Sequence, residues 1–147
     1  MAYIGLQDLL DELGENVLVQ LTDNNGSEDI DEAKVAKAIA YAQSTFDAHA
    51  RARYSIPVPN TPLVKTINLD LAVFHLMKSR STLEEGVYKI RKNANDDAIK
   101  LLLNIGSGKA ALDVPAAEET ISNPATSDQI LTNASRSKFT DSKLSGF

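Results

Sequence analysis

Arg53-Tyr54-Ser55-Ile56-Pro57-Val58-Pro59 is the stretch that decides the fold, because it ends a long amphipathic helical segment in a rigid proline loop. Pro57 and Pro59 fix their own φ angles, and each disfavours the α region for the residue before it. The helix therefore stops near Arg53, and the chain leaves it as a stiff extended strap. Nothing in this stretch is catalytic, so the sequence indicates a protein that supplies shape.

The helix in front of this loop is predicted over residues 31–53, with Asp29 or Asp31 as its N-terminal cap. At 1.5 Å per residue it would be about 35 Å long. Its stripe consists of Val35, Ala38, Ile39, Ala42, Phe46 and His49. Many alanines lie on its other faces and allow neighbours to approach from several sides, which is typical of a central helix.

Shorter helical patterns flank this segment. Leucines at helical spacing predict a helix over residues 6–13, with another turn or two near residues 17–21. Thr61-Pro62, an N-cap followed by proline at the first helical position, begins a helix that ends near Ser79-Arg80. The predicted fold class is therefore all-α, a small helical domain around one long central helix.

The last helix is predicted to begin after Ser81 or Thr82, which precede Glu84-Glu85 in the form of a capping box. It continues to Gly106-Ser107-Gly108, a glycine stop. Residues 109–114 are expected to add a short strand or a strap. The helical domain is therefore assigned to residues 1–114.

Residues 115–147 form a predicted extended arm, because they contain ten Ser or Thr and few apolar residues before the end. Such a composition does not bury enough surface to offset its ordering entropy, so residues 115–133 are expected to be mobile in the monomer. Three apolar side chains return at the end among basic residues: Phe139, Leu144 and Phe147. These three are the predicted docking residues of the arm.

Composition limits the possible functions. The chain has no cysteine, which excludes disulfides and thiolate metal sites, and its formal net charge of −5 argues against broad attraction to DNA phosphates. The start of the chain lacks the basic residues of a secretory signal, and its apolar runs are too short to cross a bilayer. We therefore expect neither membrane insertion nor tight DNA binding.

No catalytic or metal-binding constellation is present in the sequence. His49 and His75 are the only histidines, and each lies within a predicted helix without a second ligand at metal-binding spacing. Gly106-Ser107-Gly108 is too short for a phosphate loop and lacks its lysine. We expect a protein that is not an enzyme and has no metal or cofactor.

The predicted interface residues are Arg53, Tyr54, Pro57 and Pro59, which set the geometry of the loop. Two roles stay open for the Arg53-Tyr54 pair. It can be a helix C-terminal charge with an aromatic plug under the loop. It can equally be an anchor between subunits, because Arg and Tyr are typical interface residues.

Several of these segments occur together in one family. Met1-Ala2-Tyr3-Ile4, Gln20-Leu21-Thr22-Asp23, Arg53-Tyr54 with its proline loop, and Ala98-Ile99-Lys100-Leu101-Leu102 stand in this order. The chain resembles a family of small virion proteins of Mu-like phages and prophages, encoded beside the major capsid gene. Such proteins are similar to the helical head–tail adaptors of tailed phages.

The resemblance implies a virion protein of the neck region, assembled in the cytoplasm of the bacterial host. It implies a homo-oligomeric ring, expected to be dodecameric, beneath the portal protein, with a downstream neck or tail-completion protein as the next partner. Packaged DNA would pass through the lumen without tight binding. Two alternatives remain: a tail-completion or terminator protein, and a small helical DNA-binding regulator.

Overall fold

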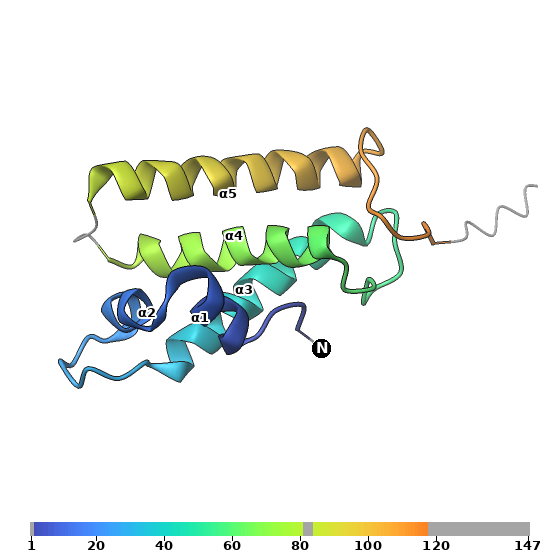
Figure 1. Ribbon diagram of the computed structural model, residues 1–147. Coiled ribbons are helices and arrows are strands. Elements are labelled where there is room, and N and C mark those ends of the chain that lie inside the picture. Colours follow the sequence, from blue (N-terminus) through green and yellow to red (C-terminus); the bar gives the residue numbers. More distant parts are fainter. Residues whose placement is uncertain (1, 81–83, 118–147) are drawn as a thin grey trace, which may run out of the picture. The chain divides into compact units, whose positions relative to one another are not determined.

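The computed structural model describes residues 2–80 and 84–117, and within these residues the chain is all-α, as predicted (Figure 1). No helix in this part of the chain is both long and apolar enough to span a bilayer. The helices follow the chain in the order Leu6–Leu13 (α1), Glu15–Thr22 (α2), Glu32–Ala50 (α3), Pro62–Lys78 (α4) and Glu85–Gly106 (α5).

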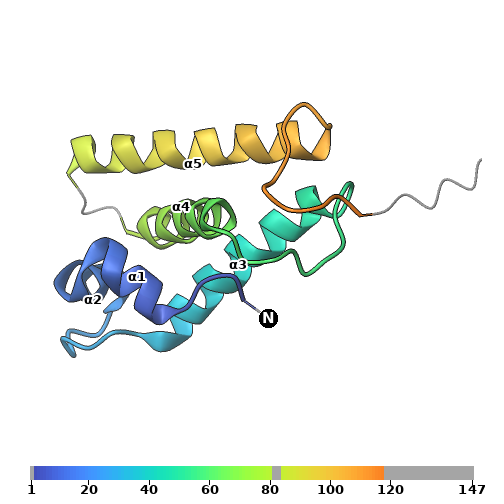
Figure 2. The same ribbon diagram turned by 45° about the vertical axis from the view of Figure 1, so that its right-hand side comes forward.

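Helix α4 lies between α3 and α5, and α1 and α2 pack on the side of α3 and α4 that faces away from α5 (Figures 1 and 2). Eight of the 17 residues of α4 are buried, compared with six of 19 in α3 and three of 22 in α5. The central position that the alanines predict for α3 is therefore shared with α4.

Two predicted helix starts are confirmed by their caps. The carboxylate of Asp31 accepts hydrogen bonds from the N–H groups of Ala33 and Lys34, at 3.0 and 3.2 Å. The Thr61 hydroxyl accepts one from the N–H of Val64 at 3.4 Å, with proline in the first turn. Each cap satisfies N–H groups that the helix itself leaves without partners.

The start of α5 differs from the prediction. The predicted capping residues, Ser81 and Thr82, lie outside the described residues, and the helix begins at Glu85 with Glu84 in the capping position. The Glu84 side chain makes no capping hydrogen bond. This helix therefore depends on its packing against α4 and α3 more than on its first turn.

The end of the long helix is also predicted incorrectly, because α3 ends at Ala50 and not at Arg53. The N–H groups of Arg53 and Tyr54 both donate to the carbonyl oxygen of Ala50, at 3.0 and 2.9 Å. This shared acceptor tightens the last turn and directs Tyr54 inward. The prediction followed the helical sequence pattern, which continues past the point where the backbone changes its hydrogen bonding.

The core of the described residues is built mostly from aliphatic side chains, with Tyr3, Phe46 and Tyr54 as its buried aromatic residues. Phe46 of α3 is fully buried, and the ring of Tyr3 meets it edge-on at a centroid distance of 5.0 Å.

After α5, residues 109–114 form a strap without strand pairing, and Leu112 of this strap is buried in the same core. Of the two forms expected for this segment, the strap is the one observed.

Candidate interface at the proline loop

Arg53 and Tyr54 fasten the C-terminal strap to the end of α3. Tyr54 is buried, and its hydroxyl accepts a hydrogen bond from the N–H of Leu112 at 2.8 Å. The carbonyl oxygen of Arg53 accepts one from the N–H of Ala117 at 3.0 Å. The exposed Arg53 guanidinium lies where a side chain on Gly108 would stand. Within the single chain, Tyr54 is therefore buried and holds the strap.

A second tyrosine holds the proline loop from below. The hydroxyl of Tyr3 donates to the Asp47 carboxylate at 2.7 Å and accepts from the N–H of Val58 at 3.1 Å. The Asn60 side chain donates to the carbonyl oxygen of Tyr3 at 2.8 Å. Burial of the ring and the hydrogen bond to Asp47 raise the pKa of Tyr3 to about 12. The hydroxyl therefore keeps its proton at neutral pH, and both of its hydrogen bonds persist.

The outer side of the loop is exposed. Ile56, Pro57 and Pro59 face solvent, whereas Val58 between the two prolines is buried. A pocket of about 350 Å³ opens beside them, lined by Ala2, Tyr3, Pro57, Val58, Pro59 and Asn60. The loop thus presents apolar atoms to solvent on a backbone that is hydrogen-bonded from inside.

Three basic residues lie close to the start of this loop. Arg51, Arg53 and Lys109 are all exposed, at the ends of α3 and α5, which meet where Gly106 approaches the carbonyl oxygen of His49. The apolar loop with its three bases is called here the proline-loop end, comprising Arg51, Arg53, Ile56, Pro57, Pro59 and Lys109. Apolar residues with arginines at their edge are typical of protein interfaces.

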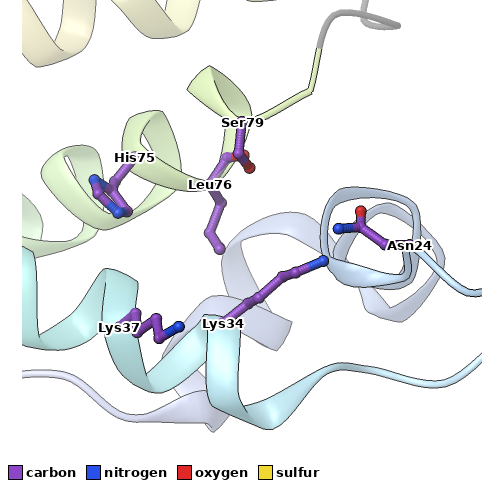
Figure 3. Close-up of a pocket in the computed structure, with 6 residues that line it drawn as sticks. All are labelled: Asn24, Lys34, Lys37, His75, Leu76 and Ser79. Atoms are coloured by element: carbon purple, nitrogen blue, oxygen red, sulfur yellow. The ribbon is translucent and has the colours of Figure 1, made fainter.

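A second, smaller pocket lies at the opposite end of α4 (Figure 3). It has a volume of about 190 Å³ and is lined by Asn24, Lys34, Lys37, His75, Leu76 and Ser79. The Lys34 amino group already donates to the carbonyl oxygen of Thr22 at 2.6 Å. His75 stacks on Tyr41, and burial together with the charge of Lys78 lowers the His75 pKa. With one cation engaged and a neutral imidazole, this pocket is a weaker candidate site.

The structure brings four of the predicted site residues together and leaves three outside. Arg53, Tyr54, Pro57 and Pro59 lie in one loop region, with Tyr54 inside and the other three exposed. The predicted docking residues of the arm lie outside the described residues: Phe139, Leu144 and Phe147.

Sequence reasoning missed the side chains that support the loop, Tyr3, Asp47 and Asn60. One signal was available for two of them. Tyr3 stands in an apolar start of the chain, and Asp47 follows the buried Phe46 in the stripe of the long helix. A carboxylate beside a core residue needs a hydrogen-bond donor, although the sequence does not say which one.

Over the described residues, the fold and this loop define a small all-α protein with an exposed proline loop that is hydrogen-bonded from inside. Residues 3–130 match the family described as Bacteriophage Mu, Gp36. The "Mu-like prophage FluMu protein gp36" of Haemophilus influenzae is 27% identical over 120 residues, which cover 81% of this chain and 81% of that relative.

The chain therefore belongs to the Bacteriophage Mu Gp36 family, because the match spans most of its length. The resemblance to a Mu-like phage family is confirmed. This family points to a structural or morphogenesis protein of a phage.

Proposed function

We propose that this chain is a head–tail adaptor, a structural virion protein whose copies form a ring beneath the portal. The ring joins the DNA-filled head to the tail and extends the DNA channel. The subunit acts mechanically and is not an enzyme. It assembles in the host cytoplasm and resides in the neck of the virion, between the portal and the next neck or tail-completion protein.

The observation that carries this proposal is the proline-loop end in a member of a Mu-like phage family. Its exposed residues lie on a backbone that is fixed from inside. The N–H of Val58 donates to the Tyr3 hydroxyl, and the hydroxyl of the nearby Tyr54 accepts a hydrogen bond from the strap. A loop ordered before binding loses little conformational entropy on contact. Such a loop suits a subunit that must fit repeated neighbours in one geometry.

Helix α3 supports the same proposal through its exposed side. Ala36, Ala40 and Ala48 face solvent, whereas Ala38 and Ala42 are buried in the core. Small exposed residues allow the backbone of a neighbouring element to come close. A ring subunit must accept neighbours on two sides, and this face of α3 is available for one of them.

The acidic balance of the chain suits a channel that DNA passes through. A formal net charge of −5 disfavours tight contact with phosphates, so DNA would slide without being held. We propose that the last residues of the arm, with Phe139, Leu144 and Phe147, dock on an adjacent subunit or on a neck protein. These aromatic and aliphatic anchors would be the main contributors to that contact.

Mass measurement of the pure protein, alone and mixed with portal protein, tests the proposal. Self-association is expected to be weak alone and complete on the portal, because ordering the arm opposes assembly. A species that stays monomeric even with portal would contradict the ring. Binding to isolated tails but not to portal would favour a tail-completion protein. A shift of duplex DNA at micromolar protein and about 150 mM salt would favour the DNA-binding regulator.

A further inference from the structure

The charges of this chain are separated along the sequence. Residues 1–33 contain nine Asp and Glu and neither Lys nor Arg, a formal charge of −9. Residues 34–117 contain twelve Lys and Arg and seven Asp and Glu, a formal charge of +5. Surfaces of opposite sign on one molecule attract each other between copies, provided that they lie apart in the fold.

The negative surface is concentrated in the loop between α2 and α3. Five carboxylates and no base lie in residues 23–32. Two of these carboxylates already accept local hydrogen bonds. Asp23 accepts from the backbone N–H groups of Asn25, Gly26 and Glu28, and Asp31 caps α3. The other three are exposed and are called here the acidic loop residues: Glu28, Asp29 and Glu32.

The positive surface is the proline-loop end, with Arg51, Arg53 and Lys109. Asp113 is exposed on the strap nearby, and Asp47 is buried with its carboxylate bonded to Tyr3, so this surface remains positive. Helix α3 separates the two surfaces, because it begins beside the acidic loop and ends at Ala50, directly before Arg51 (Figures 1 and 2). Its 19 residues span about 28 Å.

We infer that the acidic loop of one copy binds the proline-loop end of the next copy, and that this is the subunit contact of the proposed ring. A head-to-tail contact uses two different surfaces of each subunit and closes into a ring when the rotation allows. Three exposed carboxylates at one end and three exposed bases at the other give that contact its direction. This inference rests on the proposed adaptor function and assigns the two surfaces that the ring would join.

Charge complementarity favours a second copy over DNA as the occupant of the proline-loop end. DNA binding relies on many phosphate contacts, and the proline-loop end offers three bases within an acidic protein. The acidic loop, in contrast, is present in every copy at the same concentration as its target. The apolar Ile56, Pro57 and Pro59 would also be covered by a protein surface.

Charge reversal tests the contact, with assembly followed by sedimentation and crosslinking of the full chain, alone and with portal. R51E/K109E and E28K/D29K should each weaken self-association about tenfold or more, because each places like charges opposite each other. An equimolar mixture of the two variants should assemble again as alternating subunits, since both contacts in the mixture join opposite charges. Wild-type association should fall as salt rises from about 50 to 500 mM.

K89E/K100E is the matched control, because it makes the same charge change on α5 and should leave assembly unaltered. Thermal melting checks that each variant folds, and R51A/K109A replaces R51E/K109E if the reversal unfolds the chain. If the wild-type chain forms rings and both charge-reversal variants still form them, the proposed contact is wrong, while the adaptor proposal stands. A wild-type chain that never assembles, even with portal, would overturn both. Loss of duplex DNA binding in R51E/K109E with unchanged assembly would assign this end to DNA instead.

Discussion

Tyr3 and Tyr54 each place a buried hydroxyl under a backbone N–H group that lies outside any helix. A buried N–H without a partner costs about 1–3 kcal/mol, so each hydroxyl fixes the path of a segment far away in the sequence. Tyr3 fixes Val58 in the proline loop, and Tyr54 fixes Leu112 in the strap. The shape of the candidate interface thus depends on two single atoms.

Tyr3→Phe should destabilise the protein by about 1–3 kcal/mol at neutral pH, because Val58 and Asp47 lose their partner while the ring contact with Phe46 remains. It should also flatten the alkaline limb of the plot of unfolding free energy against pH. The Tyr3 pKa is raised from 10 to about 12 in the fold, so wild-type stability present below pH 10 falls between pH 10 and 12. Denaturant unfolding across this range measures both effects.

Tyr41→Phe is the control for this prediction, because Tyr41 is exposed and its stacking on His75 does not need the hydroxyl. It should leave the alkaline limb as in the wild type. An unchanged alkaline limb in Tyr3→Phe would mean that the Tyr3 hydroxyl is not held as described.

Gly108→Ala should lower stability by about 1–2 kcal/mol. Gly108 has φ of 79°, where a side chain is strained, and a Cβ there would displace the Arg53 guanidinium. Gly86→Ala provides a contrast of opposite sign, since Gly86 lies in the first turn of α5 with open space around it. It should stabilise by about 0.5–1 kcal/mol. Chemical denaturation of both variants decides, and equal effects would refute the close approach of Arg53.

The loop between α2 and α3 is an element organised by one carboxylate. Asp23 accepts hydrogen bonds from the N–H groups of Glu28, Asn25 and Gly26, which lower its pKa to about 2. Its contribution to stability is therefore present above about pH 4 and is lost as pH falls toward 2. Asp23→Asn should therefore flatten the acid limb of the plot of unfolding free energy against pH. Urea unfolding between pH 2 and 5 measures this limb.

Asp29→Asn is the matched control within the same loop, because no hydrogen bond to the Asp29 side chain is present in the described part of the chain. It should keep the acid limb of the wild type. If both variants lose the slope equally, the loop is not organised by Asp23 in particular.

Helix boundaries that have a local sequence signal could be predicted, whereas a boundary set by tertiary contacts could not. Thr61-Pro62 and Asp31 are local signals, since a cap and the N–H groups it satisfies lie within three residues of each other. The end of α3 is not local, because its last turn tightens around the buried Tyr54. The Tyr54 hydroxyl meets a partner 58 residues away, which periodicity does not reveal.

The position of the candidate site could be predicted from the sequence, but the hydrogen bonds that support it could not. The prolines and Arg53 mark the exposed loop directly in the sequence. Its support comes from Tyr3, which is 44 residues from Asp47 and 55 from Val58. Pairings over such separations are set by the tertiary fold, so the burial of Tyr54 and its bond to Leu112 had to come from the structure.

At the scale of the whole molecule, deleting residues 134–147 should leave the melting temperature of the helical domain nearly unchanged. The buried core of the described residues reaches no further than Leu112, so the deletion removes none of it. Ring formation with portal is expected to fail, because the proposed docking residues Phe139, Leu144 and Phe147 are lost. Calorimetry and sedimentation with portal measure the two effects.

Two full-length variants refine that test. Phe139→Ala/Phe147→Ala should lose assembly like the deletion, whereas Ser137→Ala/Ser142→Ala should assemble normally. A truncated protein that still forms rings and yields infectious particles at normal titre would rule out a docking role for the arm.

The position of α4 between α3 and α5 sets the order in which the molecule opens. Eight residues of α4 are buried against its neighbours, whereas α5 has three buried residues and leaves Val87, Ile90 and Leu103 exposed. Hydrogen exchange should therefore be slowest in α4, with protection close to the global unfolding free energy, and faster in the first half of α5. Under mechanical load, this fold would therefore open from α5 inward.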